Sequence, residues 1–212
     1  GDDLYGIDGE TLASSVGRLL KERGLLLGIA ESCTGGLLSS AVTGVAGSSA
    51  WFAGGVVAYA NEIKASLLGV EAELLARCGA VSGETARAMA AGAAAQLGCG
   101  IAVAVTGIAG PDGGTDTKPV GTVYIGLHHK GRTGDQRFRF SGTRRQVQEK
   151  TTHTAIFTAA PLRLIVQPSG RVKLATSWGT PSFWTAVRIV SGRVAALLVV
   201  LMAVMITSPQ RL

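Results

Sequence analysis

The stretch LLLGIAESCTGGLLSSAVTGV, residues 25–45, decides the fold. Residues 25–32 are apolar enough for a buried strand, and residues 36–45 have the composition of a helix. A short turn that ends in two glycines separates them. A strand, a tight turn and a helix in this order aim backbone N–H groups at an anion or an oxyanion. The stretch therefore predicts a ligand or nucleophile site in an α/β fold.

Strands and helices alternate on both sides of this stretch. Helices are predicted at 8–24, 61–70, 72–79, 82–98 and 143–160, and strands at 51–60, 99–110, 120–129 and 136–142. Asn61 is expected to cap its helix. The alternation predicts a three-layer α/β/α sandwich with a mixed, mostly parallel sheet, in a domain spanning residues 1–160.

Ligands of such sheets bind at the carboxyl ends of the strands. Three turns are expected at that edge, and we expect them to converge there. They are ESCTGG at 31–36, AYANEIK at 58–64 and TGIAGPDGG at 106–114.

Residues 161–212 form an atypical basic and apolar tail. The chain of 212 residues has a net charge of +6, and every excess cation lies in this tail. Because these cations are spread out, they argue against a nucleic-acid partner. The apolar run at 194–206 is shorter than the roughly 20 residues that a membrane span needs. We therefore expect a packed or disordered appendage, with a membrane anchor at 183–206 and translation in a shifted frame as the alternatives.

The three cysteines, Cys33, Cys78 and Cys99, show no CxxC pair and no metal-ligand spacing. Neither a metal nor a cofactor is therefore expected. An odd number of cysteines without a secretory leader favours reduced thiols and a cytoplasmic protein.

Ser32 is the candidate nucleophile, and a base must remove its proton. The chain's three histidines all lie beyond residue 127, far from Ser32 in sequence. Glu31 would point to the opposite face of the strand, so Lys64, one turn into the helix after Tyr59, is the better candidate. A lysine acts as a base only when neutral, so burial must lower its pKa from about 10.4. Cys33 ranks below Ser32 because no histidine is near to generate a thiolate.

Each of these residues also has a structural interpretation. Ser32 could cap the helix that follows it. Lys64 could be a solvated surface charge, Tyr59 a core residue with its hydroxyl at the rim, and residues 106–114 simply a wide turn. Each motif alone is weak.

Taken together, the motifs are far more specific. In order, AESCTGG, SSAWFAGGVVAYANEIKASLLGV, GAVSGETA and VAVTGIAGPDGGTDTKPVGTVYIGL resemble the C-terminal domain of the competence/damage-inducible protein CinA, also known as stand-alone nicotinamide-nucleotide amidases (PncC). The resemblance runs from about residue 4 to residue 155, and residues 1–12 look like the linker to an N-terminal half that this chain lacks.

The resemblance implies hydrolysis of the carboxamide of nicotinamide mononucleotide to nicotinate mononucleotide and ammonia. The partner would be this small nucleotide, and the assembly a homodimer or larger homo-oligomer. The family's serine–lysine pair corresponds to Ser32 and Lys64, its active-site tyrosine to Tyr59, and its small hydroxyl residue to Thr106. Asn61, two residues after Tyr59, completes an element similar to the Tyr-x-Asn of class C β-lactamases.

In the implied mechanism, Lys64, aided by Tyr59, takes the Ser32 proton and an acyl-enzyme forms. Backbone N–H groups near Cys33 and Thr34 hold the oxyanion. The residues expected to bind the substrate are Cys33, Thr34, Gly35, Gly36, Asn61, Thr106, Gly107, Gly110 and Arg144.

The chain departs from the family where SGDR…VR is usual. It has Ser141, Gly142, Thr143 and Arg144, and Gln148 replaces the second arginine. Arg144 could still bind phosphate, but a phosphate or dimer contact there is in question. The alternative function is a non-catalytic module that binds a pyridine nucleotide and regulates the rest of a CinA-type protein. Amidohydrolysis of another small amide and a membrane-tethered interaction protein are further alternatives.

Overall fold

The computed structural model describes residues 11–160, 164–166 and 172–174. The chain divides into two units, of which residues 12–160 form one. In the other unit, β6 (Leu164–Val166) and β7 (Val172–Leu174) form an antiparallel pair of strands. Residues 1–10 of the predicted linker and the apolar run at 194–206 lie outside the described residues. The last residue of that linker, Leu12, begins a helix. Among the helices that are described, none is long and apolar enough to cross a membrane.

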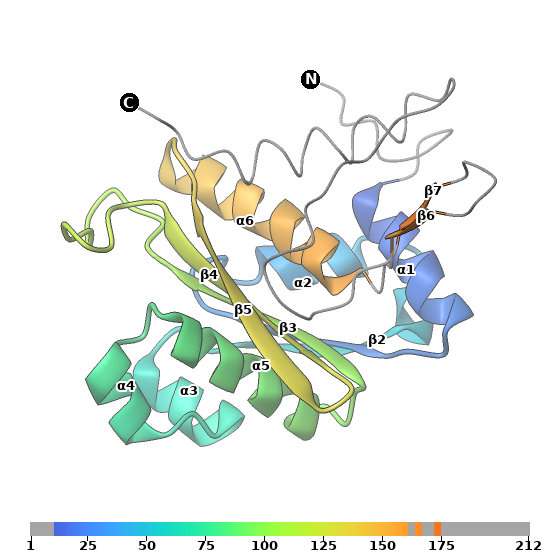
Figure 1. Ribbon diagram of the computed structural model, residues 1–212, viewed down its shortest axis with the longest axis horizontal. Helices are drawn as coiled ribbons and strands as arrows, with labels where there is room; N and C mark the ends of the chain where they lie inside the picture. The colour runs from blue at the N-terminus through green and yellow to red at the C-terminus, as the bar shows by residue number, and fades with distance from the viewer. Residues whose placement is uncertain (1–10, 161–163, 167–171, 175–212) are drawn as a thin grey trace. The chain divides into compact units, whose positions relative to one another are not determined.

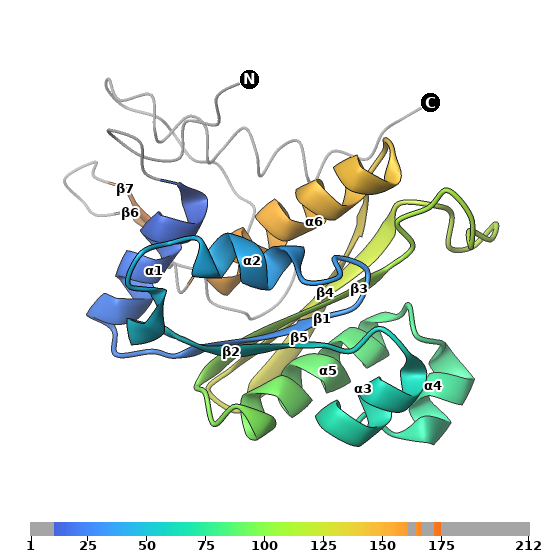
Figure 2. The same cartoon turned by 180° about the vertical axis from the view of Figure 1, so that it is seen from behind.

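Five strands form one sheet in the order β2-β1-β3-β4-β5 (Figures 1 and 2). The parallel pairs join β1 (Leu27–Glu31) to β2 (Phe52–Val57) and to β3 (Ile101–Gly107). The antiparallel pairs join β4 (Thr122–His129) to β3 and to β5 (Arg132–Arg139). In this sheet β4 alone runs against the other strands, which confirms a mixed, mostly parallel sheet.

The edge strand β5 differs from its predicted range of 136–142. It begins at Arg132 because Lys130 and Gly131, with φ of 51° and 73°, make a tight turn directly after β4. Positive φ at both central residues is the geometry that lets two strands pair immediately on either side of a turn. The hairpin therefore starts earlier than its alternation of apolar and polar residues indicated.

Helices cover both faces of the sheet, which confirms the three layers (Figure 2). One layer holds α1 (Leu12–Glu22), α2 (Leu37–Thr43) and α6 (Arg144–Ala159). The other holds α3 (Asn61–Leu68), α4 (Ala72–Cys78) and α5 (Gly83–Gln96), and a 3₁₀ turn, η1 (Ser48–Ala50), precedes β2. The central strand β1 is buried along its whole length, as expected of a strand covered on both faces.

Close backbone packing fixes the position of α3 on α5. A Cβ atom at Gly92 of α5 would lie 1.9 Å from the carbonyl oxygen of Leu68 at the end of α3, so only glycine fits there. The predicted cap of α3 is wrong, because Ala60 occupies the cap position and Asn61 is already the first helical residue. Packing against α5, rather than a side-chain cap, therefore holds α3 in place.

Candidate functional site

The turn after β1 is anchored on two sides by its own backbone. Ser32 is buried, and its amide donates to the carbonyl of Val105 in β3 at 3.0 Å. On the other side, the amide of Ala58 donates to the carbonyl of Glu31 at 2.8 Å. The carboxyl end of β1 therefore lies between the ends of β2 and β3. The site was expected at this end of the sheet.

The glycine pair makes the sharp bend from this turn into α2. Gly35 and Gly36 have φ of 61° and 102°, a region of backbone conformation that residues with a Cβ atom rarely adopt. Gly36 is the cap residue of α2, so the interpretation of Ser32 as a helix cap is wrong. The side chain that serves the helix start is Glu31, whose carboxylate accepts hydrogen bonds from the amides of Gly36, Leu38 and Ser39.

The amides of the turn can be accounted for one by one. Those of Gly35 and Leu37 donate to the carbonyls of Ser32 and Thr34. In the described structure, every amide from Ser32 to Ser40 donates to a backbone or carboxylate oxygen except those of Cys33 and Thr34. The Thr34 hydroxyl oxygen is also buried without a partner among the described residues. The turn thus keeps two backbone amides that no oxygen of the described residues engages.

Lys64 is the largest fully buried side chain of the described domain, with 1% exposure. It shares the inner face of α3 with Leu68, and its Nζ donates to the carbonyl of Tyr59 at 2.8 Å. Burial lowers the pKa of Lys64, while the charges of Cys33 and Glu62 act in the opposite direction. The interpretation of Lys64 as a solvated surface charge is therefore wrong.

Cys33, the residue after Ser32, lies within electrostatic reach of both Lys64 and Arg144. Burial raises the pKa of Cys33 to about 12, and the charge of Glu31 acts in the same direction. Cys33 is therefore a neutral thiol near pH 7. It carries no negative charge that would stabilise the Lys64 ammonium. This also disfavours Cys33 as a nucleophile, because the thiolate is the reactive form.

Two side chains of α6 connect the three turns. The guanidinium of Arg144 donates to the carbonyl of Gly110 at 2.9 Å and to the hydroxyl of Tyr59 at 3.2 Å. The side-chain amide of Gln148, one helical turn later, donates to the carbonyl of Cys33 at 2.9 Å. The structure therefore brings together the three turns whose convergence the sequence only suggested.

Tyr59 does not behave as a core residue, because it is 62% exposed. Its hydroxyl oxygen accepts from Arg144, so its own hydroxyl hydrogen remains able to donate to a ligand. Its contact with Lys64 is made by the backbone carbonyl and not by the phenol.

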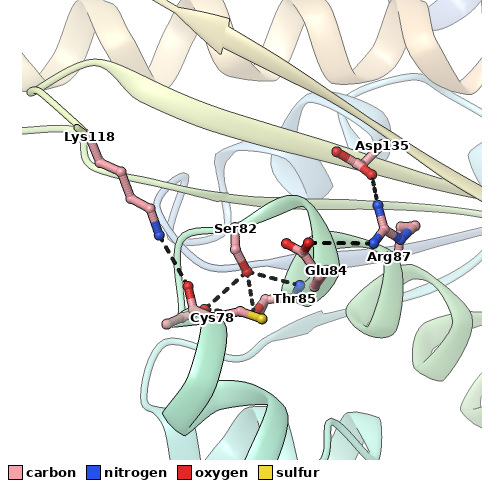
Figure 3. Close-up of polar contacts among 8 residues, drawn as sticks. Cys78, Ser82, Glu84, Thr85, Arg87, Lys118 and Asp135 are labelled. Atoms are coloured by element: carbon pink, nitrogen blue, oxygen red, sulfur yellow. Dashed lines mark hydrogen bonds and ion pairs between the residues drawn. The ribbon is translucent and has the colours of Figure 1, made fainter.

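The loop between α4 and α5 is fixed beside the end of β3. The hydroxyl of Thr106 donates to the carbonyl of Ala80 at 2.7 Å, which commits its hydrogen and leaves its oxygen as an acceptor. Lys118 donates to the carbonyl of Cys78 at 3.1 Å (Figure 3). The hydroxyls of Ser82 and Thr85 both donate to the carbonyl of Gly79. This loop and the glycine loop that carries Lys118 are therefore held to one another.

The remaining predicted residues lie around these contacts. Gly107 ends β3, and Gly110 supplies the carbonyl that Arg144 binds. Asn61 is exposed in the first turn of α3, at the same sheet edge. Within the described ranges there is no cluster of side chains that could hold a metal ion.

Three residues that shape this site were not predicted from the sequence. Glu31 was discarded as a base without being given another role, although a lone charge inside an apolar strand was a visible signal. Gln148 was treated only as a lost arginine, and Lys118 was not singled out. The contacts of Gln148 and Lys118 cross 115 and 40 residues of sequence, and no local pattern shows such contacts.

Comparison with known proteins connects this arrangement with one family. The family model described as the CinA C-terminal domain matches residues 9–161. A CinA-like protein from Geobacter sulfurreducens is 51% identical over 156 residues, which cover 74% of this chain and 38% of that protein. A putative competence-damage inducible protein from Symbiobacterium thermophilum is 61% identical over 131 residues, or 62% of this chain and 31% of that protein. The chain thus spans well under half the length of these curated relatives.

Solved structures agree on the fold. A competence/damage-inducible protein from Agrobacterium tumefaciens has a TM-score of 0.68 at 41% identity, covering 74% of this chain and 96% of that one. A CinA superfamily protein from Klebsiella pneumoniae has a TM-score of 0.68 at 38% identity, covering 70% of this chain and 93% of that one.

Proposed function

The chain belongs to the family of CinA C-terminal domains, and from this we propose that it hydrolyses the carboxamide of nicotinamide mononucleotide to nicotinate mononucleotide and ammonia. The proposed enzyme is a serine–lysine amidase whose reaction passes through an acyl-enzyme intermediate. It concerns the domain alone, since the relatives are longer proteins.

The observation that carries the proposal is the buried amine of Lys64 at the sheet edge. An ammonium taken out of water loses much of its solvation, which favours the neutral amine. That amine donates to the Tyr59 carbonyl, and Tyr59 follows Ala58, whose own amide donates to the Glu31 carbonyl at the end of β1. A lysine in this state is able to take a proton from a neighbouring hydroxyl, and Ser32 is the hydroxyl that the turn supplies.

The proposed reaction proceeds in two steps. Neutral Lys64 takes the proton of the Ser32 hydroxyl as its oxygen bonds to the amide carbon, and the amides of Cys33 and Thr34 donate to the developing oxyanion. One such donor typically lowers the activation barrier by about 3 kcal/mol. Lys64 then passes the proton to the departing nitrogen, and ammonia leaves. Water, deprotonated by Lys64, attacks the ester and releases the acid and Ser32.

Arg144 supports a nucleotide as the substrate. It provides a positive charge near Cys33 and lies between Tyr59 and Gly110. A guanidinium is well suited to phosphate, with which it forms paired, charge-assisted hydrogen bonds. We assign to it the phosphate of the substrate, while the glycines of the two loops leave room for the ribose.

Mass spectrometry of nicotinamide mononucleotide incubated with the chain tests the proposal. We expect conversion of the amide to the acid with the parent chain and none with Ser32→Ala. If both chains leave the nucleotide intact but its addition raises the Tm of the parent, the domain is a binding module and not an amidase. Turnover by the Ser32→Ala variant would reject Ser32 as the nucleophile.

A further inference from the structure

Glu31 is a fully buried acid that the proposed reaction leaves without a role. Both of its carboxylate oxygens are occupied, one by the amides of Gly36 and Leu38 at 3.0 Å and the other by the amide of Ser39 at 2.8 Å. We propose that Glu31 is a positioning residue: its carboxylate ties the end of β1 to the start of α2 and thereby holds the Ser32–Thr34 turn in its reactive shape. This inference rests on the proposed function only in taking Ser32 as the nucleophile.

The helix α2 cannot hold its own start. The helix has seven residues, and its cap residue Gly36 offers no side-chain hydrogen bond. Helices this short are marginal without tertiary support, and the first amides of any helix lack partners within it. Glu31 supplies those partners from the adjacent strand, so the helix start is fixed relative to β1.

Glu31 also decides which amides of the turn remain free. Because Glu31 takes the donors of Gly36, Leu38 and Ser39, a ligand at the turn meets only those of Cys33 and Thr34. Without the carboxylate, the part-buried amides of Gly36 and Ser39 would compete for an incoming anion at the wrong position. Glu31 therefore determines where on the turn an oxyanion is received.

Glu31 is also separated electrostatically from Lys64. Since the Cys33 thiol is neutral, Glu62 is the anion that favours the Lys64 ammonium, and Glu31 is not among the charges that act on that amine. The carboxylate faces the amides of α2, whereas Lys64 belongs to α3 on the other face of the sheet. Glu31 can thus hold the turn without giving Lys64 an anionic partner that would favour the ammonium.

Glu31→Gln tests the role because it keeps the size of the side chain. Its amide group turns a donor toward the helix amides, so those of Leu38 and Ser39 cannot both remain bonded. We expect labelling of Ser32 by a fluorophosphonate to slow by about tenfold or more, as reactions that depend on orientation do. In ¹⁵N–¹H spectra, the amide signals of Cys33 and Thr34 should shift.

Val16→Ala, at a buried position of α1, is the control for stability. It should lower the Tm while leaving the labelling rate and the turn's amide signals as in the parent. If Glu31→Gln does not fold, Glu31→Asp, which keeps the charge but withdraws it by one methylene, is measured in the same way.

Labelling at the parent rate with unchanged turn signals would overturn the inference, and so would an equal loss of labelling in Val16→Ala. If the parent is not labelled at Ser32 at all, the proposed nucleophile fails. The amide signals of the Glu31 variant then still decide whether this carboxylate holds the turn.

Discussion

Replacing Lys64 with methionine separates the chemical role of the amine from the packing of its stem. Methionine is unbranched, neutral and flexible enough to fill the same space. A general base typically contributes a factor of about 10² to 10⁴ to the rate, so ammonia release from nicotinamide mononucleotide should fall by about 10³ or more. Folding should not suffer in parallel. The lost bond to the Tyr59 carbonyl costs about 1 kcal/mol, and removal of a buried amine offsets that cost.

The same variant gives a pH test whose sign follows from the lowered pKa of Lys64. In the unfolded chain the amine titrates near its ordinary value of about 10.4. Between the lowered pKa and that value, the unfolded chain binds a proton that the folded chain does not, so stability rises with pH. The slope approaches about 1.4 kcal/mol per pH unit within this window. Below the window the cost of burying Lys64 is present in full, and above it the cost vanishes.

Urea unfolding of parent and Lys64→Met, from neutral pH to beyond the ordinary lysine pKa, measures this difference. The free energy of unfolding of the parent minus that of the variant should climb with pH through the window. Lys21→Met is the matched control, since Lys21 is exposed on α1, and its difference from the parent should stay flat. A flat difference for Lys64→Met, or retained turnover, would refute the reasoning.

Three further predictions concern the residues around the turn. Arg144→Ala should raise KM by about tenfold more for nicotinamide mononucleotide than for the riboside, which lacks the phosphate that we assign to Arg144. Steady-state kinetics with both substrates measure this difference, and equal increases in KM would contradict the assignment. Gln148→Leu should lower kcat by about tenfold with little change in KM, because the Cys33 carbonyl loses its donor and the adjacent amides reorient. An unchanged kcat would show that this contact is not needed. Iodoacetamide at neutral pH should modify the partly exposed Cys78 well before Cys33, whose pKa of about 12 withholds the thiolate, as peptide mass spectrometry can show.

The fold was predictable because its signals are local. The strand, the glycine turn and the helix of residues 25–45 are written in adjacent residues, and β1 and α2 form as the sequence indicated. The hairpin of β4 and β5 was less visible. Its turn uses Lys130 at positive φ, a conformation that a lysine seldom adopts and that no turn signature announces.

The site was predictable only in part. Ser32, Lys64, Tyr59, Thr106 and Arg144 do lie around one sheet edge, but which contacts join them depends on tertiary structure. Gln148 reaches Cys33 only because α6 packs beside α2, which places its first turns next to the turn after β1. The sequence marks such a residue as an ordinary polar position on a helix, so its role becomes visible only in space.

The helix α3 shows how far the chain departs from local rules to place its amine. Its sequence NEIKASLL would be expected to bury Ile63 and Leu67, which lie four residues apart on one face. The structure instead exposes Ile63 by 37% and Leu67 by 49% and buries Lys64 with Leu68. Rotating the helix to bury the two apolar side chains would move Lys64 toward solvent, where its pKa would return toward the ordinary value. Local patterns are most often broken at functional or strained sites, and the base role that we propose for Lys64 accounts for this exposed apolar face.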